Sequence, residues 1–414
     1  MSKLVLYAPI DWSRYRLTRF RIIVISCVML ALVVGVTAAQ FSEARYHILP
    51  GGAPVGGDYV AFYAAAHALR EGDASAIYDL PAFEEKLHEH GPPKERFGLA
   101  WQYPPTYFFL VAPLAFLGFI PGYIAWTGGT AAAYFATMRA TGFRGVFLLV
   151  ILASPSTFHA TITGQNGFLT AALIAIAALY ADKRPIVAGL AAALLTVKPQ
   201  LGLLLPIAYL TGGCWRAFIV AALGAAMLAL ASAFALGTEP WLAFLGSVPA
   251  VSDRLASGAM PLFKMTTPFA AARYAGLPVW AAMVFYAAFA VAAAGAVALV
   301  WRRVREAELR AAMLAAGVFL VAPYGFYYEM IVLALPIAIL AKRGLARGWL
   351  PFEQAALTLA AALPLFLPGD AHRAGVSLGL FVILIIAASV VRRVAHDYPA
   401  TFRFASASLR PRPD

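Results

Sequence analysis

Long apolar stretches alternate with short polar turns along almost the whole chain. The stretches at 21–40 and 279–301 match the roughly 20 residues with which a helix crosses the hydrocarbon core of a bilayer. Several other stretches are too short to cross it alone. The pattern predicts up to thirteen helices, near 21–40, 105–119, 121–138, 145–159, 166–181, 185–197, 200–211, 216–236, 277–301, 311–322, 326–341, 349–367 and 374–391.

The segment 41–100 departs from this pattern because it mixes apolar and charged positions. Residues 59–70 separate apolar from polar side chains at helical spacing, and Gly72 is a residue suited to ending a helix. We expect this amphipathic helix to lie along the outer membrane surface. A second short helix is expected near 81–90, where a proline occupies the first turn.

The composition indicates a protein built into a membrane. Hydrophobic residues make up 62% of the 414 positions and charged residues only 13%, against about 25% in soluble domains. The mean hydropathy is +0.76. We therefore expect an all-α polytopic membrane protein with a single domain over 21–393, made of about 10–13 transmembrane or half-spanning helices. The first apolar run, about 19 residues long, exceeds the core of a signal peptide and is expected to remain as the first helix.

The net charge of +12 is concentrated in tails and short turns, so we expect it to set membrane orientation and not to bind nucleic acid. If the helices alternate in direction, 22 lysines and arginines fall on the cytoplasmic side and 9 outside. The tails 1–20 and 394–414 are then cytoplasmic, and 41–100 and 237–275 lie outside an inner (plasma) membrane. This orientation requires 105–138 to cross the membrane once, although it contains two apolar segments.

Specific polar and aromatic residues gather where the helices are expected to end on the outer side. Their convergence predicts one site at that face. Motifs of nucleotide- and metal-dependent soluble enzymes, such as GxxxxGK[ST], HExxH and CxxC, do not occur in the sequence. The outer segments are GGDYVAFY (56–63), WQYPPTY (101–107), TGQNG (163–167), TVKPQ (196–200) and PYGFYYE (323–329).

The order of these motifs carries a resemblance. An Asp-aromatic pair opens a loop helix, and YD (78–79), YPP (103–105), GQN (164–166), KP (198–199) and a late proline-aromatic-acidic segment follow. Over roughly 20–345 this set resembles glycosyltransferase family 87, membrane mannosyltransferases of the C-type superfamily that use polyprenyl-phosphate sugars. Glu329 stands where the family pattern has aspartate. The resemblance implies a C-type bundle that transfers a hexose, mannose in the family pattern, to a lipid or glycan acceptor at the extracytoplasmic face, without a cofactor.

Such a transfer needs a base for the acceptor hydroxyl and a positive environment for the departing phosphate. An outer-loop acid, Asp58, and a lysine at membrane depth, Lys198, form the minimum set, and a direct inverting displacement is expected because phosphate leaves without a second acid. The further substrate-binding candidates are Tyr63, Tyr103, Gln165, Asn166, Arg254, Lys264, Arg273, Tyr328 and Glu329.

Each candidate also has a purely structural interpretation. Asp58 is well placed to be the N-cap of the helix that follows it. Lys198 has the length to snorkel to the membrane surface, although Pro199 favours a broken helix beside a polar cavity. Gln165 and Asn166 suit a helix cap or an interhelical hydrogen bond.

The remaining candidates have alternatives of the same kind. The tyrosines at the outer ends match an interfacial aromatic belt, and Glu329 is suited to pairing with Lys198 or with an arginine of 237–275. The basic residues of 252–273 are either solvated charges or phosphate contacts.

Three histidines, His67, His88 and His90, invite a metal site. His88 and His90 are two residues apart and do not share a helix face, so we expect a solvated surface and no metal. The rival function is a transporter or lipid-sugar flippase of the same composition. Transporters often have matching broken helices in two halves, whereas one break, at Lys198-Pro199, stands out here.

Overall fold

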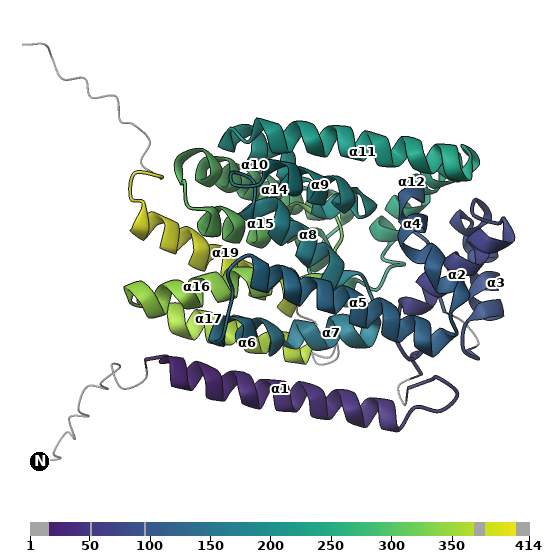
Figure 1. Ribbon diagram of the computed structural model, residues 1–414, viewed down its shortest axis with the longest axis horizontal. Coiled ribbons are helices and arrows are strands. Elements are labelled where there is room, and N and C mark those ends of the chain that lie inside the picture. The colour runs from purple at the N-terminus through teal and green to yellow at the C-terminus, as the bar shows by residue number, and fades with distance from the viewer. Residues whose placement is uncertain (1–15, 50–51, 95–96, 368–376, 403–414) are drawn as a thin grey trace, which may run out of the picture.

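The computed structural model describes residues 16–49, 52–94, 97–367 and 377–402, and these are almost entirely helical (Figure 1). Within these ranges extended pairing is limited to isolated bridges, such as Met265 with Phe326. Every one of the thirteen predicted apolar segments contains helix. The protein is therefore an all-α polytopic membrane protein, as predicted. The tails 1–20 and 394–414 lie mostly outside the described residues.

Among the described residues, four helices are long and apolar enough to cross a bilayer: α1 (Arg19–Ser42), α11 (Trp215–Leu236), α14 (Val279–Arg303) and α19 (Leu378–Asp397). A fifth span is formed if α6 (Val146–Leu152) and α7 (Pro155–Thr163), which meet at 46°, are counted together. Pro155 explains the bend because proline tolerates the first turn of a helix but not its interior. Helices α1, α11 and α14 are mostly unburied, whereas half of α19 is buried. Helices α11 and α1 flank the body of the molecule on opposite sides in Figure 1.

The interior consists of shorter or broken helices. Leu309 to Leu320 of α15 and most of α8 are buried, so these helices form the centre of the bundle. Non-spanning backbone is tolerated at membrane depth when other protein elements cover it. The shorter elements packed around them are α9 (Pro185–Leu194), η5 (Leu195–Val197), η6 (Pro199–Leu201), α10 (Leu204–Gly212), η8 (Tyr327–Leu333), α16 (Ala334–Arg347), α17 (Glu353–Ala362) and η9 (Leu363–Phe366), beside α8 (Gly167–Leu179) and α15 (Ala307–Val321).

Small residues allow helices α9 and α11 to pack closely against each other. A Cβ atom added to Gly189 would lie 2.6 Å from Val220 Cβ, and one added to Gly224 would lie 2.7 Å from Ala193 Cβ. Lipid tails give no hydrophobic drive for two helices to associate, so close van der Waals packing through glycine and alanine supplies the attraction. A larger residue at either glycine would separate the helices.

The structure divides 105–138, which the predicted orientation requires to cross the membrane once, into two unequal halves. Its first half folds into the short elements η3 (Pro105–Tyr107), α4 (Phe108–Val111) and η4 (Ala112–Phe116), and its second half is the 22-residue helix α5 (Phe119–Ala140). The short elements pack against α2 (Tyr59–Glu71), so only α5 runs the length of the bundle. Pro105 and Pro113 keep the first half in short turns.

Helix α2 ends at Gly72 in a left-handed conformation (φ 88°), as predicted, but its expected position on the membrane surface is wrong. Every residue from Tyr59 to Ala68 is buried. Alanines on several faces let α3 (Leu80–His90), α4 and η4 approach closely, so the polar face is covered as well as the apolar one. The helix is thus a core element of the site end of the molecule.

The segment 237–275, which the hydrophobic pattern left as a loop, contains the 19-residue helix α12 (Glu239–Ser257), the turn η7 (Leu262–Lys264) and α13 (Pro268–Tyr274). Helix α12 contacts η2 (Ala76–Tyr78), and the rings of Phe244 and Tyr78 meet edge to face. The two segments predicted to lie outside are therefore neighbours in space.

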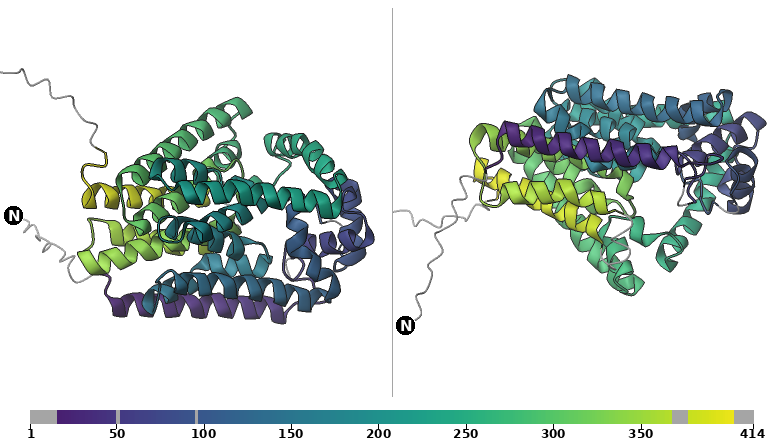
Figure 2. Two further views of the ribbon diagram at one scale, coloured as in Figure 1. Left: turned by 45° about the horizontal axis from the view of Figure 1, so that its top comes forward. Right: turned by 90° about the horizontal axis from the view of Figure 1, so that it is seen from below.

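The segments predicted to be cytoplasmic also lie together, at the other end of the molecule. Trp349 Nε1 donates to Leu17 O, Arg303 Nη1 donates to Thr401 O, and Arg310 pairs with Asp182. The start of α1 and the end of α19 share this end, whereas α2 and α3 occupy the opposite one (Figures 1 and 2). The charged turns and the loop elements are thus separated by the length of the bundle, which the predicted orientation requires.

Candidate active site

A cavity of about 150 Å³ lies at the end of the bundle that carries α2. Six parts of the chain form its wall, and all five outer motifs contribute at least one residue to it. The wall includes Asp58, Gln102, Tyr103, Gln165, Lys198, Gln200, Arg254, Met260, Lys264, Tyr324, Tyr327 and Tyr328.

Two glycine turns place Asp58 against Gln165. Gly57 and Gly164 both have positive φ values, 50° and 54°, which L side chains rarely adopt. The turns also touch: a Cβ added to Gly57 would lie 2.9 Å from Thr163 Cα, and one added to Gly164 would lie 2.8 Å from Gly56 O. Gln165 Nε2 consequently donates to Asp58 Oδ2 at 3.1 Å.

Asp58 occupies the N-cap position of α2, yet its side chain makes no capping hydrogen bond to the described backbone of that helix. The interpretation of this carboxylate as a cap is therefore wrong. It is turned toward Gln165 and the cavity. Asp79, the N-cap residue of the next helix, α3, does make such a bond: its side chain accepts from Ala82 N at 3.1 Å.

Burial raises the pKa of Asp58 above its ordinary value. The hydrogen bond from Gln165 and the charges of Lys264, Lys198 and Lys94 oppose this effect, but burial prevails. A carboxylate with a raised pKa is a stronger proton acceptor than an ordinary aspartate. The surroundings of Asp58 therefore suit a general base.

Lys198 lies at a break between two short 3₁₀ turns, η5 and η6, and points inward. Its side chain is only 5% exposed, so the interpretation as a snorkelling lysine is wrong. Nζ donates to Asn166 Oδ1 at 3.0 Å, pairs with Glu329 and lies over the rings of Tyr103 and Tyr328. Pro199 breaks the helix here, as predicted, and so turns the lysine into the cavity.

Asn166 and Glu329 stand behind Lys198 and do not line the cavity themselves. Asn166 makes no capping bond to the described backbone of α8; its Nδ2 donates to Tyr107 Oη at 3.1 Å, so the interhelical alternative is confirmed. Glu329 is fully buried, and its Oε2 accepts from Phe326 N at 2.7 Å. The predicted pairing of Glu329 with Lys198 is confirmed, and both groups orient the lysine.

The tyrosines near the site do not form an interfacial belt. Tyr107 is fully buried, Tyr327 is 8% exposed and Tyr328 is 5% exposed, all inside protein. Tyr103 stacks on Tyr107 with ring centroids 4.2 Å apart, and its hydroxyl donates to Gln165 Oε1 at 3.0 Å. These rings thus form a rigid polar-edged wall that fixes Gln165.

Two of the three outer basic candidates reach the cavity. Arg254 from α12 and Lys264 from η7 both line it, and Arg254 Nε is buried with no hydrogen-bond partner among the described residues. Arg273 is elsewhere, because it donates to Leu277 O and Ala256 O and so fastens α13 to α12. Tyr63 is also outside the cavity, since its hydroxyl donates to Leu117 O at 3.0 Å.

A second cavity, of about 430 Å³, adjoins the first and shares Asp58, Lys264 and Tyr327 with it. Glu43 and Lys94 add charged groups to its wall. Neither residue is predicted from the sequence, because both stand in polar segments with no motif around them. Only the fold shows that these loops turn back toward Asp58.

The comparison with protein families agrees with this geometry. Residues 101–323, more than half of the chain, match the sequence profile of glycosyltransferase family 87. No curated protein and no solved structure matches the chain significantly. The matched range includes Lys198, Arg254 and Lys264, whereas Asp58 and Glu329 lie outside it and are placed at the site by the structure. The match favours a membrane glycosyltransferase over the transporter alternative, and the chain belongs to glycosyltransferase family 87.

Proposed function

We propose that this membrane glycosyltransferase takes a hexose, specifically mannose, from a polyprenyl-phosphate donor and transfers it with inversion to a lipid or glycan acceptor. The observation that carries the proposal is the position of Asp58 between two cavities. One cavity has Lys198, Arg254 and Lys264 on its wall, and the other opens toward Glu43 and Lys94. A phosphate and an acceptor hydroxyl can therefore approach the same carboxylate from two sides.

In this proposal the acceptor oxygen attacks the anomeric carbon of the sugar while the bond from that carbon to the phosphate oxygen breaks. The bonding electrons leave with the phosphate, which departs as polyprenyl phosphate. The acceptor proton passes to Asp58, whose raised pKa favours its capture. No acid is needed for the leaving group, because phosphate is already a stable anion at neutral pH.

The cations of the first cavity have distinct parts in this reaction. Lys198 supplies a buried charge whose position is fixed by Asn166 and Glu329. Arg254 offers a guanidinium group with an unused buried donor, and arginine forks match phosphate oxygens. Such pre-oriented charges stabilise a developing phosphate anion more effectively than mobile groups in water do.

We further propose that the site faces the outside of the inner (plasma) membrane, with both tails in the cytoplasm. Single cysteines at the exposed positions 85 and 253, in a variant without Cys27 and Cys214, test this orientation. A membrane-impermeant thiol reagent applied to intact cells should label both positions and spare a cysteine at position 346 in the opposite turn. Labelling of position 346 alone would reverse the orientation.

The donor and acceptor are tested together with a strain that lacks the protein. We expect its envelope lipids or glycans to accumulate a species one hexose short. Purified protein in lipid nanodiscs should then transfer radiolabelled mannose from polyprenyl-phosphate mannose to an extract of that strain, and not from a nucleotide-activated mannose. Transfer from the nucleotide sugar alone, or an unchanged envelope, would contradict the proposal.

A further inference from the structure

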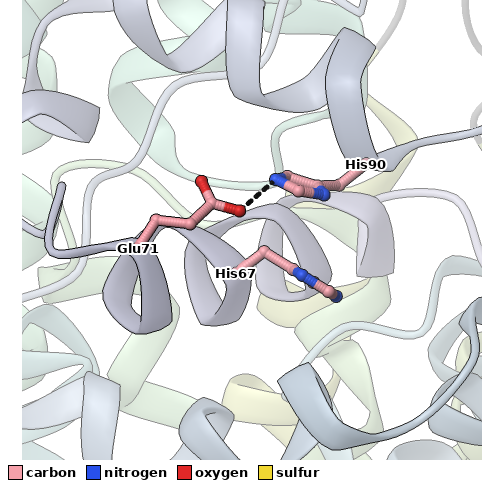
Figure 3. A group of neighbouring side chains, drawn as sticks. All are labelled: His67, Glu71 and His90. Carbon is pink, nitrogen blue, oxygen red and sulfur yellow. Dashed lines mark ion pairs between the residues drawn. The ribbon is translucent and has the colours of Figure 1, made fainter.

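A second cluster of reactive side chains lies at the far end of α2, away from the cavities. We propose that His67, Glu71 and His90 form a binding site for a divalent transition metal of the zinc type, which ties the end of α2 to the end of α3. His67 and Glu71 belong to the last turns of α2, and His90 is the last residue of α3 (Figure 3).

The three side chains are already close enough to share one ion. One ligand atom from each lies within 4.8 Å of the other two, and His90 Nε2 lies 2.9 Å from Glu71 Oε1. The two imidazole rings stack with centroids 4.3 Å apart and an interplanar angle of 19°. Zinc bonds to nitrogen and oxygen are about 2.0–2.2 Å long, so ligand atoms around it stand roughly 3–3.5 Å apart. Side-chain rotation of the histidines supplies the remaining approach.

Burial supplies a second and independent indication. The side chain of His67 is only 8% exposed, and its Nε2 finds no hydrogen-bond partner in the described part of the chain. His90 Nε2 is also buried. Glu71 Oε1 lies 2.9 Å from it, but the angle between the two groups does not meet the requirement for a hydrogen bond. A buried polar atom without a partner is costly. Coordination of a metal by these nitrogens would remove that cost.

The chemistry of the three groups suits this kind of ion. Imidazole nitrogen and carboxylate oxygen are ligands that zinc takes in proteins.

Two cationic side chains contact the proposed ligands: Lys86 contacts Glu71 and Arg70 contacts His67. Lys86 Nζ lies 2.6 Å from Glu71 Oε2 and leaves Oε1 for a metal, so it acts as the outer partner that ligating carboxylates usually have. Arg70 Nη2 lies 3.0 Å from His67 Nδ1, while its Nη1 donates to Ala115 O. Coordination through Nε2 places the proton of His67 on Nδ1, so the Arg70 contact must open. Arg70 consequently weakens the site.

Comparison of His88 with His90 along one helix does not predict this group. The partner of His90 is His67, on a different helix, and the interpretation of both as solvated is wrong. His88 is exposed, as expected. Nine residues of helix separate His67 from Asp58, about 13 Å at the usual rise, so the ion would hold the fold and would not touch the reacting groups.

Zinc titration of the purified full-length protein, stripped with a chelator, tests the site. We expect one zinc ion per chain after desalting and a higher thermal unfolding temperature when zinc is added. His90→Gln and Glu71→Gln should each lower zinc affinity at least tenfold, whereas His88→Gln, on the exposed face of the same helix, should leave it unchanged. Absence of stoichiometric zinc, or equal loss in all three variants, would overturn the proposal.

Arg70→Gln provides a gain-of-binding test that does not depend on a destabilised variant. Removal of the guanidinium charge beside His67 should tighten zinc binding severalfold in a folded protein. Unchanged or weaker affinity would contradict coordination through His67.

Discussion

The two ends of the bundle both bury ions, but they treat them differently. At the end away from the cavities, each fully buried arginine is paired with a carboxylate: Arg393 with Glu353, Arg343 with Asp397 and Glu306, and Arg310 with Asp182. At the cavity end, Asp58, Lys198, Arg254 and Lys264 all reach a cavity wall. The first end is closed by its ion pairs and the second is left open.

The two ends differ in the hydrogen-bond partners of their buried carboxylates. Glu353 accepts from Arg393 Nε at 2.9 Å and from Leu350 N at 3.0 Å, so its lone pairs are used within the fold. Asp58 accepts from the neutral amide of Gln165 and otherwise faces cavities on two sides. A buried charge whose partners are all internal stabilises an arrangement, whereas one directed at a cavity is available to a ligand.

The comparison is tested most severely at Asp58. Asp58→Asn keeps the shape of the side chain and removes the base, and general-base catalysis contributes about 10²–10⁴-fold. We expect sugar transfer to fall at least about 100-fold while the unfolding temperature stays the same, because the carboxylate makes no capping bond that asparagine would lose. Transfer by purified wild type and variant, at matched amounts of folded protein, measures this.

Asp79 is the matched control for that substitution. Its side chain caps α3 through Ala82 N, outside both cavities that contain Asp58. Asp79→Ala should cost about 1 kcal/mol of stability and leave transfer per folded molecule unchanged. If Asp58→Asn instead behaves like Asp79→Ala, Asp58 is a structural residue.

At the closed end, substitutions should reduce stability more than sugar transfer. Glu353→Gln removes the nearer counter-charge of Arg393, which is fully buried, and leaves, among the described residues, only Asp397 at 4.0 Å; breaking such a pair costs about 3–5 kcal/mol. We expect a large loss in the free energy of unfolding in detergent, with normal transfer by the molecules that remain folded. Arg347→Gln, on the exposed side of the same cluster, should change stability by less than about 1 kcal/mol.

Lys198 combines the features of both ends, because it forms an internal ion pair with Glu329 and also lines the cavity. Lys198→Met alone would strand the buried Glu329 charge, so we expect loss of both stability and transfer. Adding Glu329→Gln should restore much of the stability and leave transfer about 10²-fold below wild type, as expected when a pre-oriented group for anion stabilisation is removed. A double variant with normal turnover would limit Lys198 to a structural role.

The sequence predicted the helical elements well because hydrophobic periodicity is local. All thirteen apolar segments, the α2 helix with its end at Gly72 and the break at Pro199 follow from neighbouring residues. The division of 105–138 into short elements and the long helix α5 did not, since the short elements depend on packing against α2. Helix α12 was missed because its apolar positions are interrupted by charges and by Pro249.

The sequence predicts many of the residues that line the candidate site, but not how they contact one another. Lys198, Gln165 and Tyr103 were found because polar and aromatic residues at helix ends form motifs. Tyr63 and Arg273 carry the same chemistry, but their hydrogen bonds to Leu117 O and Leu277 O hold them elsewhere. Lys94 and the pair of His67 with His90 depend on contacts between segments, which no local pattern contains.

The smallest expected effect concerns the pH dependence of transfer and the charge of Lys264. Asp58 must be ionised to accept a proton, so activity falls as pH drops through its pKa, which burial has raised. Lys264 lowers that pKa, and its removal in Lys264→Met should therefore move the acid limb of the profile of kcat/KM to higher pH. Lys183→Met, an exposed lysine at the closed end, should leave the limb where it is. If the acid limb stays in place in both variants, the titrating group is not Asp58. If it moves to lower pH in Lys264→Met, Lys264 does not lower the pKa of the titrating group.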